Sequence, residues 1–259
     1  MGKGNSRIRA DQLLALRNYA PSRSRARDMI ARGCVKADGT VVAKAGALLA
    51  ADAKIEIDDP GSGYVSRAAL KLIAGLQASG FDATDVHALD LGASTGGFTQ
   101  VLLQNGASSV LAIDVGHAQM VAEIADDPRV TNLEGINARD LTAEILTPPP
   151  ELIVSDVSFI SLRIAAEPAL RLAALNARSV LLVKPQFEVG REGIGKGGLV
   201  TDEALVTQIL AEISQWFNSL PGWTMTKLIP SPITGGDGNK EYLLCGERSE
   251  HSEHGEHHA

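Results

Sequence analysis

The segment Asp90-Leu-Gly-Ala-Ser-Thr-Gly-Gly-Phe98 decides the fold of this chain. It contains the end of an apolar run at 87–91, which predicts a buried strand, and it leads into a segment with a helical pattern. The next apolar run ends in an acidic residue, Asp114. A glycine-rich turn between a strand and a helix, with a carboxylate after the second strand, is typical of nucleotide-binding α/β domains. We therefore expect a ligand site at the carboxyl ends of these strands.

The residues inside the loop narrow the choice of ligand. The dinucleotide fingerprint GxGxxG needs glycine where Ser94 stands, and a phosphate-binding P-loop needs lysine where Phe98 stands. A carboxylate such as Asp114 can accept both hydroxyls of a ribose. An adenosine without phosphates fits these residues, and we expect S-adenosylmethionine as the cofactor. The residues expected to bind it are Asp90, Gly92, Ala93, Ser94, Gly96, Gly97, Phe98 and Asp114, with Asn137 and Asp140 on the adenosine side.

Strands and helices alternate around this loop. Further strands are expected at 109–113, 129–133, 152–155, 180–183, 224–229 and 242–245, and helices at 66–79, 161–174 and 202–217. This alternation predicts a mainly parallel sheet with helices on both faces.

The composition excludes several classes of protein. Apolar residues (44%) and charged residues (21%) are ordinary for a globular chain, no apolar run approaches the ~20 residues of a membrane-spanning helix, and the N-terminus lacks an apolar signal segment. Cys34 and Cys245 are too far apart for a CxxC metal site and are expected in the core. We expect a cytoplasmic protein with no stable membrane association and no obligatory metal.

Residues 1–50 are basic in an otherwise acidic chain. They carry ten lysines and arginines against three acidic residues, whereas the formal net charge of the whole chain is −7. Leucines near helical spacing in 11–19, an N-cap at Ser22 for a helix that ends near Arg32, and an Asp38-Gly39 turn predict two helices followed by a hairpin. The positive charge of residues 1–50 favours binding to a polyanion. The alternative interpretation is a basic surface that is only solvated.

This order of elements, with Gly33, Val35 and Lys44 in place, resembles the small RNA-binding module named after ribosomal protein S-four. The resemblance implies a small α+β domain of the α-L type that sets a basic helix face against structured RNA. The arginines of the second helix are expected to point largely outward. The residues expected to contact RNA are Arg7, Arg9, Arg23, Arg25, Arg27, Arg32, Lys36 and, later in the chain, Arg67.

Residues 58–63 are rich in residue types that interrupt helices and strands, and this predicts a domain boundary. We expect an RNA-binding domain at 1–59, a linker at 60–65, the α/β domain at 66–247 and a disordered polar tail at 248–259. Four of the six histidines lie in that tail, where any metal binding is expected to be incidental.

Four polar residues are expected at one edge of the sheet: Lys71, Asp156, Lys184 and Glu241. Each one alone is compatible with an ordinary residue at a strand end. As a set, Lys, Asp, Lys and Glu in this order resemble the catalytic tetrad of the FtsJ-like ribose 2′-O-methyltransferases, whose catalytic domain is a Rossmann-like class I methyltransferase.

The resemblance extends over nearly the whole chain to the TlyA (hemolysin A) family of rRNA methyltransferases. It is carried by Tyr64-Val-Ser-Arg-Ala-Ala-Leu-Lys71-Leu, by the glycine-rich segment, by Asp156-Val-Ser-Phe-Ile-Ser and by Lys184-Pro-Gln-Phe-Glu188. It implies methylation of cytidine 2′-hydroxyls in 16S rRNA, 23S rRNA or both, on free RNA or on ribosomal subunits. Tyr64 stands where some members have tryptophan.

The sequence leaves the chemistry of Lys184 open. A neighbouring cation, Lys71, favours a neutral general base, whereas the carboxylates Asp156 and Glu241 favour a charged lysine that stabilises the developing alkoxide. Two other functions also stay open: an RNA methyltransferase with a different acceptor atom, and a membrane-active protein, which the hemolysin name invites. The target nucleotide and the oligomeric state are not determined by the sequence.

Overall fold

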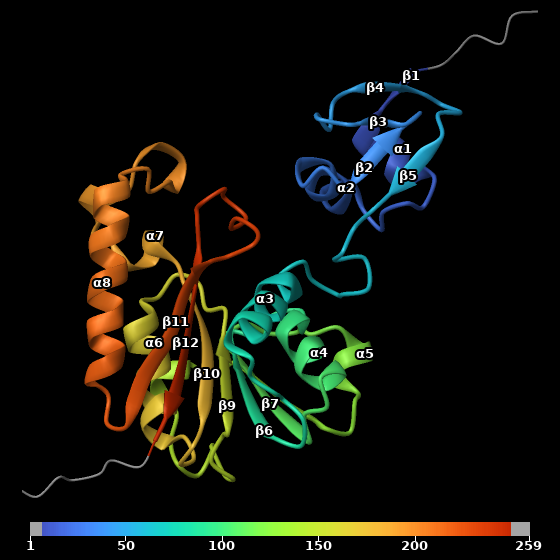
Figure 1. The fold of residues 1–259 in the computed structure, drawn as a ribbon. Helices are drawn as coiled ribbons and strands as arrows, with labels where there is room; N and C mark the ends of the chain where they lie inside the picture. Colours follow the sequence, from blue (N-terminus) through green and yellow to red (C-terminus); the bar gives the residue numbers. More distant parts are fainter. Residues whose placement is uncertain (1–6, 250–259) are drawn as a thin grey trace, which may run out of the picture. The chain divides into compact units, whose positions relative to one another are not determined.

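The chain divides between residues 63 and 64 into two units, Met1–Gly63 and Tyr64–Ala259 (Figure 1). The computed structural model describes residues 7–249. The division lies inside the segment 60–65 that was expected as a linker. The last strand ends at Arg248, and Ser249 N–H donates to the Gly222 carbonyl at 2.9 Å, so the predicted tail begins inside this strand and its residues 250–259 lie outside the described part of the chain.

The N-terminal unit contains the two predicted helices and the predicted hairpin. Ser22 begins the second helix as expected, because its Oγ accepts the Arg25 N–H at 3.2 Å. Three-residue strands at 7–9, 48–50 and 55–57 were missed, since they are too short to show an alternating pattern. The elements are β1 (Arg7–Arg9), α1 (Ala10–Leu16), α2 (Arg23–Ala31), β2 (Val35–Ala37), β3 (Thr40–Val41), β4 (Leu48–Ala50) and β5 (Ile55–Ile57). β2 pairs antiparallel with β3 and β5, and β1 with β4.

The second unit is built on a seven-stranded sheet in the order β11-β12-β10-β9-β6-β7-β8. The strands are β6 (His87–Leu91), β7 (Ser109–Asp114), β8 (Val130–Glu134), β9 (Leu152–Ser155), β10 (Arg178–Val183), β11 (Trp223–Pro230) and β12 (Tyr242–Arg248). The five strands from β6 to β10 run parallel, and β12 runs antiparallel to both of its neighbours. The predicted mainly parallel sheet is confirmed.

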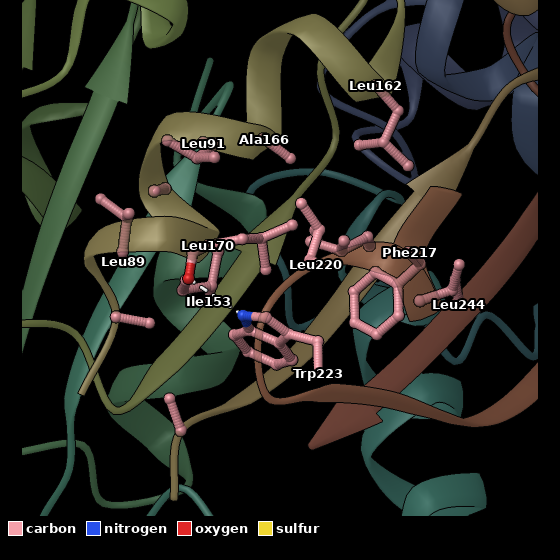
Figure 2. Close-up of a cluster of buried hydrophobic side chains, with 14 of the residues drawn as sticks. Leu89, Leu91, Ile153, Leu162, Ala166, Leu170, Phe217, Leu220, Trp223 and Leu244 are labelled. Atoms are coloured by element: carbon pink, nitrogen blue, oxygen red, sulfur yellow. Dashed lines mark hydrogen bonds between the residues drawn. The ribbon is translucent and has the colours of Figure 1, made fainter. Parts of the chain in front are cut away.

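Helices cover both faces of this sheet, because strand residues alternate between two apolar cores. On β10, Val180 and Leu182 pack with α3 and α4, while Leu181 and Val183 pack with α6 and α8. The core that contains Leu181 and Val183 is shown in Figure 2, where Trp223 Nε1 donates to the Leu170 carbonyl at 2.9 Å. The helices are α3 (Ala69–Ser79), α4 (Gly97–Gln104), α5 (Ala122–Ala125), α6 (Leu162–Leu172), α7 (Pro185–Glu188) and α8 (Glu203–Ser219).

Among the described helices, none combines the length and the apolar character that crossing a bilayer requires. Cys34 and Cys245 are free and buried, as predicted. Within residues 7–249, no cluster of three or more histidine, cysteine or acidic side chains is placed to hold a metal ion.

Candidate active site

The glycine-rich loop between β6 and α4 lies against the chain that follows β9. Gly92 has a φ of +80°, and a Cβ at this position would stand 3.0 Å from the Asp156 carbonyl oxygen. Ser94 also adopts a left-handed conformation, with a φ of +47°. Its N–H donates to Asp114 Oδ2 at 2.8 Å, which explains why this non-glycine residue is held there.

Asp114 joins this loop to the turn after β7. Its Oδ2 accepts the Ser94 N–H, and its Oδ1 accepts the Gly116 N–H at 2.7 Å. Gln119 Nε2 also donates to Oδ1, at 3.4 Å, so among the described residues Oδ2 is the oxygen that keeps a lone pair for a further donor. Asp114 lines a cavity of about 620 Å³, a volume typical of small-molecule sites. Other lining residues are Gly92, Ser94, Val115, Gln119, Ile136, Asn137, Ala138, Arg139, Ser158, Phe159 and Ile160.

Three of the expected cofactor residues line neither the cavity at Asp114 nor a smaller cavity beside Lys184, which is described below. Asp90 is fully buried beneath the loop, where Thr99 Oγ1 donates to its Oδ2 at 2.7 Å and its Oδ1 has no hydrogen-bond partner among the described residues. Asp140 is exposed and pairs only loosely with Arg139, at 3.7 Å. Gly96 packs against Ile124. In this structure the Asp90 carboxyl anchors α4 through Thr99, and its contact with a cofactor stays a prediction.

Burial raises the pKa of Asp90 to about 7. Because this value lies above the ordinary 3.8, the folded protein binds more protons than the unfolded chain between the two values, and the free energy of unfolding falls as the pH rises from about 4 to about 7. Asp90→Asn keeps an acceptor for Thr99 but cannot ionise. We expect thermal unfolding to show the variant gaining stability relative to the native chain between pH 5 and pH 8. If the variant and the native chain differ in stability by the same amount at pH 5 and at pH 8, the raised pKa of Asp90 is contradicted.

Lys71, Asp156, Lys184 and Glu241 form one chain of ion pairs. Lys71 Nζ lies 2.7 Å from Glu241 Oε2 and 3.2 Å from Asp156 Oδ2, and Lys184 Nζ lies 2.6 Å from Asp156 Oδ1. Their side chains are 7%, 3%, 15% and 8% exposed in the order Lys71, Glu241, Asp156 and Lys184. The tetrad is thus nearly buried, and it pairs two lysines with two carboxylates.

Strand directions explain why these four residues meet. Asp156 and Lys184 follow the parallel strands β9 and β10, and Glu241 precedes β12, which is antiparallel to β10. The start of β12 therefore lies at the same sheet edge as the ends of β9 and β10. Lys71 reaches this edge from the first turn of α3.

A second cavity, of about 330 Å³, is lined by the tetrad and by loop residues. It shares Gly92, Ser94, Asp156, Ser158 and Phe159 with the larger cavity, so the two are contiguous. Several residues that line this cavity were not expected from the sequence, although all but Asp237 lie in segments that carried the family resemblance. They are Ser66, Ser158, Phe159, Gln186, Phe187 and Asp237.

Ser158 and Phe159 stand next to the tetrad. Lys184 Nζ donates to Ser158 Oγ at 2.7 Å. Phe159 is 91% exposed, has a φ of +64° and places its ring centroid 5.2 Å from that of Phe187. An exposed aromatic ring on strained backbone at a cavity rim is typical of a ligand-contacting residue, because the strain persists only where the surrounding structure maintains it.

In the N-terminal unit, three arginines converge on one buried carboxylate. Asp11 is fully buried, and it pairs with Arg9 Nε at 3.0 Å, Arg23 Nη2 at 2.9 Å and Arg27 Nε at 3.1 Å. These partners hold the pKa of Asp11 well below its usual range. The arginine side chains stay 45%, 46% and 56% exposed, so the cluster presents an excess of positive charge to solvent.

Arg25 and Arg32 were expected to point outward, but their side chains are largely buried. Their side chains are only 19% and 12% exposed, because Arg32 donates to both oxygens of Asp59 at 2.6 and 2.8 Å and Arg25 donates to the Gly61 carbonyl at 2.7 Å. Both tie α2 to the chain that leaves this unit. Of the other basic residues expected to contact RNA, Arg7 and Lys36 are exposed and Arg67 is partly buried.

Comparison with known proteins covers both units. A family model described as FtsJ-like methyltransferase matches residues 64–248, and one described as S4 domain matches residues 8–55. A protein of Mycobacterium tuberculosis named 16S/23S rRNA (cytidine-2′-O)-methyltransferase TlyA is 41% identical over 239 residues, which cover 92% of this chain and 89% of that protein.

Two further relatives match over similar lengths. Hemolysin A of Brachyspira hyodysenteriae is 39% identical over 238 residues, which cover 91% of this chain and 98% of that protein. A solved structure from Streptococcus thermophilus superposes with a TM-score of 0.72 at 34% identity and covers 95% of this chain and 90% of that one. The likeness therefore includes both units and the segments that hold the tetrad.

Proposed function

The chain belongs to the TlyA family of FtsJ-like methyltransferases, and from this premise we propose that it transfers a methyl group from S-adenosylmethionine to the 2′-hydroxyl of a cytidine in ribosomal RNA. The observation that carries the proposal is the ion-paired tetrad beside the glycine-rich loop, in a cavity contiguous with a larger one. Cytidine and ribosomal RNA are taken from the name of the Mycobacterium tuberculosis relative.

The loop and the larger cavity fit the proposed cofactor. Gly92 lets the chain after β9 approach the loop, and a side chain at this position would collide with that backbone. Asp114 Oδ2 keeps a lone pair for one ribose hydroxyl, and a second hydroxyl at Oδ1 would replace the long hydrogen bond from Gln119 Nε2, at 3.4 Å. The adenosine part would lie in the larger cavity, near Asn137 and the apolar side chains of Val115 and Ile136, and the methionine part would lie over the loop toward the tetrad.

In the proposed reaction, Lys184 acts as a charged group and holds the acceptor oxygen. Its Nζ is ion-paired with Asp156 and donates to Ser158 Oγ, and because an ammonium carries three N–H groups, one can still donate to the 2′-oxygen. In this proposal Lys184 is an ammonium ion-paired with Asp156 at 2.6 Å, it stabilises the negative charge that develops on the 2′-oxygen, and the hydroxyl proton leaves to water. S-adenosylmethionine supplies a methyl group on a positively charged sulfur, which becomes a neutral thioether when the methyl is transferred.

The other tetrad members hold Lys184 in place. Asp156 bridges the two lysines, and Lys71 is held in turn by Glu241. Because positioning of reacting groups supplies several kcal/mol of a barrier, a rigid ion-paired chain suits this task. The exposed Phe159 ring at the rim could then stack on the target base, since aromatic rings form stacking platforms for unstacked bases in RNA recognition.

The direct test of the proposed function is methyl transfer to purified ribosomal subunits. Small and large subunits are each incubated with the protein and S-adenosylmethionine labelled in the methyl group, and the methylated nucleoside is identified by mass spectrometry. We expect 2′-O-methylcytidine. A methylated base would assign a different acceptor atom, and unmodified RNA from both subunits would contradict the proposal.

Asp114→Ala should weaken S-adenosylmethionine binding strongly. The variant loses the carboxylate proposed to accept the ribose hydroxyls, and hydrogen bonds to charged groups contribute ~1.5–3 kcal/mol each, so we expect Kd to rise by about 100-fold. Calorimetric titration measures this effect. Asp140→Ala serves as the matched control, because Asp140 is an exposed carboxylate outside both cavities. Equal affinities of the two variants would remove Asp114 from the cofactor site.

The N-terminal unit is proposed to supply RNA affinity through exposed basic groups. Replacing Arg9, Arg23 and Arg27 together would leave Asp11 buried without a partner, so we choose the double variant Arg27→Ala/Lys36→Ala, which leaves two arginines on Asp11. We expect weaker binding to RNA of any sequence and a slope of log K against log salt that is shallower by about 0.7–0.9 per lost phosphate contact. Lys227→Ala, an exposed lysine on β11, is the control. An unchanged slope would mean that this face is only solvated.

A further inference from the structure

Glu188 is a buried carboxylate that the proposed chemistry does not use. It ends α7, the short helix that follows Lys184, and its side chain is only 2% exposed. Its nearest cation, Arg163, lies 3.8 Å away and forms its closer ion pair with Glu212, at 3.1 Å. A buried carboxylate needs compensating donors, so the donors that Glu188 has found indicate its role.

Both oxygens of Glu188 accept hydrogen bonds from the beginning of α6. Oε2 accepts from Ser161 Oγ at 2.7 Å, and Oε1 accepts from the Leu162 N–H at 2.6 Å. The side chain of Ser161, the N-cap residue, makes no capping bond to its own helix. Glu188 therefore caps α6 from a different element, and its negative charge suits the positive end of the helix dipole.

The segment from Asp156 to Leu162 is held at both of its ends by residues 184–188, which comprise α7 and the residue before it. Lys184 binds Asp156 and Ser158 at the first end, and Glu188 binds Ser161 and Leu162 at the second. Phe159, with its strained backbone and exposed ring, lies between these two points of attachment. Its ring also contacts Phe187, which directly precedes Glu188.

We propose that Glu188 is a positioning residue for methyl transfer: by clamping segment 156–162 to α7, it sets the positions of Ser158 and Phe159 relative to Lys184. This inference rests on the proposed function. Glu188 lines neither cavity and touches no group proposed to react, so it acts through the residues that it holds. Loss of the clamp should let Phe159 relax from its left-handed conformation, because within residues 7–249 Glu188 makes the side-chain hydrogen bonds that Ser161 and Leu162 have.

The test compares Glu188→Ala with Asp202→Ala. Asp202 also caps a helix with its carboxylate, but as the exposed N-cap residue of α8 itself: it accepts the Ala204 and Leu205 N–H groups at 2.9 and 3.2 Å and has no bond to segment 156–162. We expect both variants to lower Tm. At saturating subunits and cofactor, only Glu188→Ala should lower the single-turnover rate of methyl transfer, by at least about tenfold, since small displacements of reacting groups have large effects on rate.

Two further measurements separate the possible outcomes. Glu188→Gln keeps an oxygen that can accept the Leu162 N–H and should restore most of the rate. Hydrogen exchange, read by mass spectrometry, should increase in residues 156–162 for Glu188→Ala and not for Asp202→Ala. If the native chain methylates neither subunit, the proposed function fails, and unchanged exchange in this segment would overturn the clamp independently. A Glu188→Ala rate that falls only in proportion to the folded fraction would reduce Glu188 to an ordinary helix cap.

Discussion

Lys184→Ala is expected to lower the rate of methyl transfer by about 10³-fold while the protein stays folded. The variant removes the only N–H donor that the tetrad offers to a substrate oxygen in our proposal. Its effect on stability should be modest, because Asp156 keeps Lys71 as a partner at 3.2 Å. Single-turnover methyl transfer and thermal unfolding, measured on the same preparation, check both parts of this expectation.

The matched control for Lys184→Ala is Lys184→Arg, which keeps a positive charge on a longer and planar head group. Because the two cations differ in shape, the arginine variant should keep the ion pair and the stability but recover little activity. A stable Lys184→Ala protein that transfers methyl groups at a near native rate would remove Lys184 from the reaction. S-adenosylmethionine affinity, measured by calorimetry, should change little in both variants.

Lys71→Ala is expected to have the larger effect on stability. Glu241 is 3% exposed, and Lys71 is its one ion-pair partner among the described residues. Removing one member of a buried pair leaves an uncompensated charge and costs ~3–5 kcal/mol. For a domain of this size, that loss corresponds to a decrease in Tm of about 10 °C. Calorimetry on the full chain measures this decrease.

A double variant separates the contribution of Lys71 to stability from its contribution to methyl transfer. Lys71→Met/Glu241→Leu replaces both charges with apolar side chains, and it should recover much of the Tm that Lys71→Ala loses, since an apolar pair of similar volume can replace a buried ion pair. Methyl transfer should stay low, because Asp156 and Lys184 lose the neighbours that hold them. An active double variant would show that Lys71 and Glu241 serve stability alone.

The sequence determined the sheet and the site's location because these depend on local patterns. The apolar run at 87–91 coincides with β6, and the glycine-rich turn after it leads into α4. Strand ends can be counted along the chain, so Asp114, Asp156 and Lys184 could be assigned to one edge of the sheet before any coordinates. The order Lys, Asp, Lys, Glu carried the family resemblance because it, too, can be read along the chain without coordinates.

Tertiary structure decided how the charged groups pair and which of them face solvent, since these properties depend on partners distant in sequence. Asp59 and the Gly61 carbonyl bury Arg32 and Arg25, which composition alone would place on an RNA-binding face, whereas the three arginines paired with Asp11 stay about half exposed. The partnerless oxygen of Asp90 and the bonds of Glu188 to the start of α6 have no local signature either. A carboxylate has the same appearance in a sequence whether it is exposed, paired or buried. Its desolvation and its donors are set only when separate elements pack together.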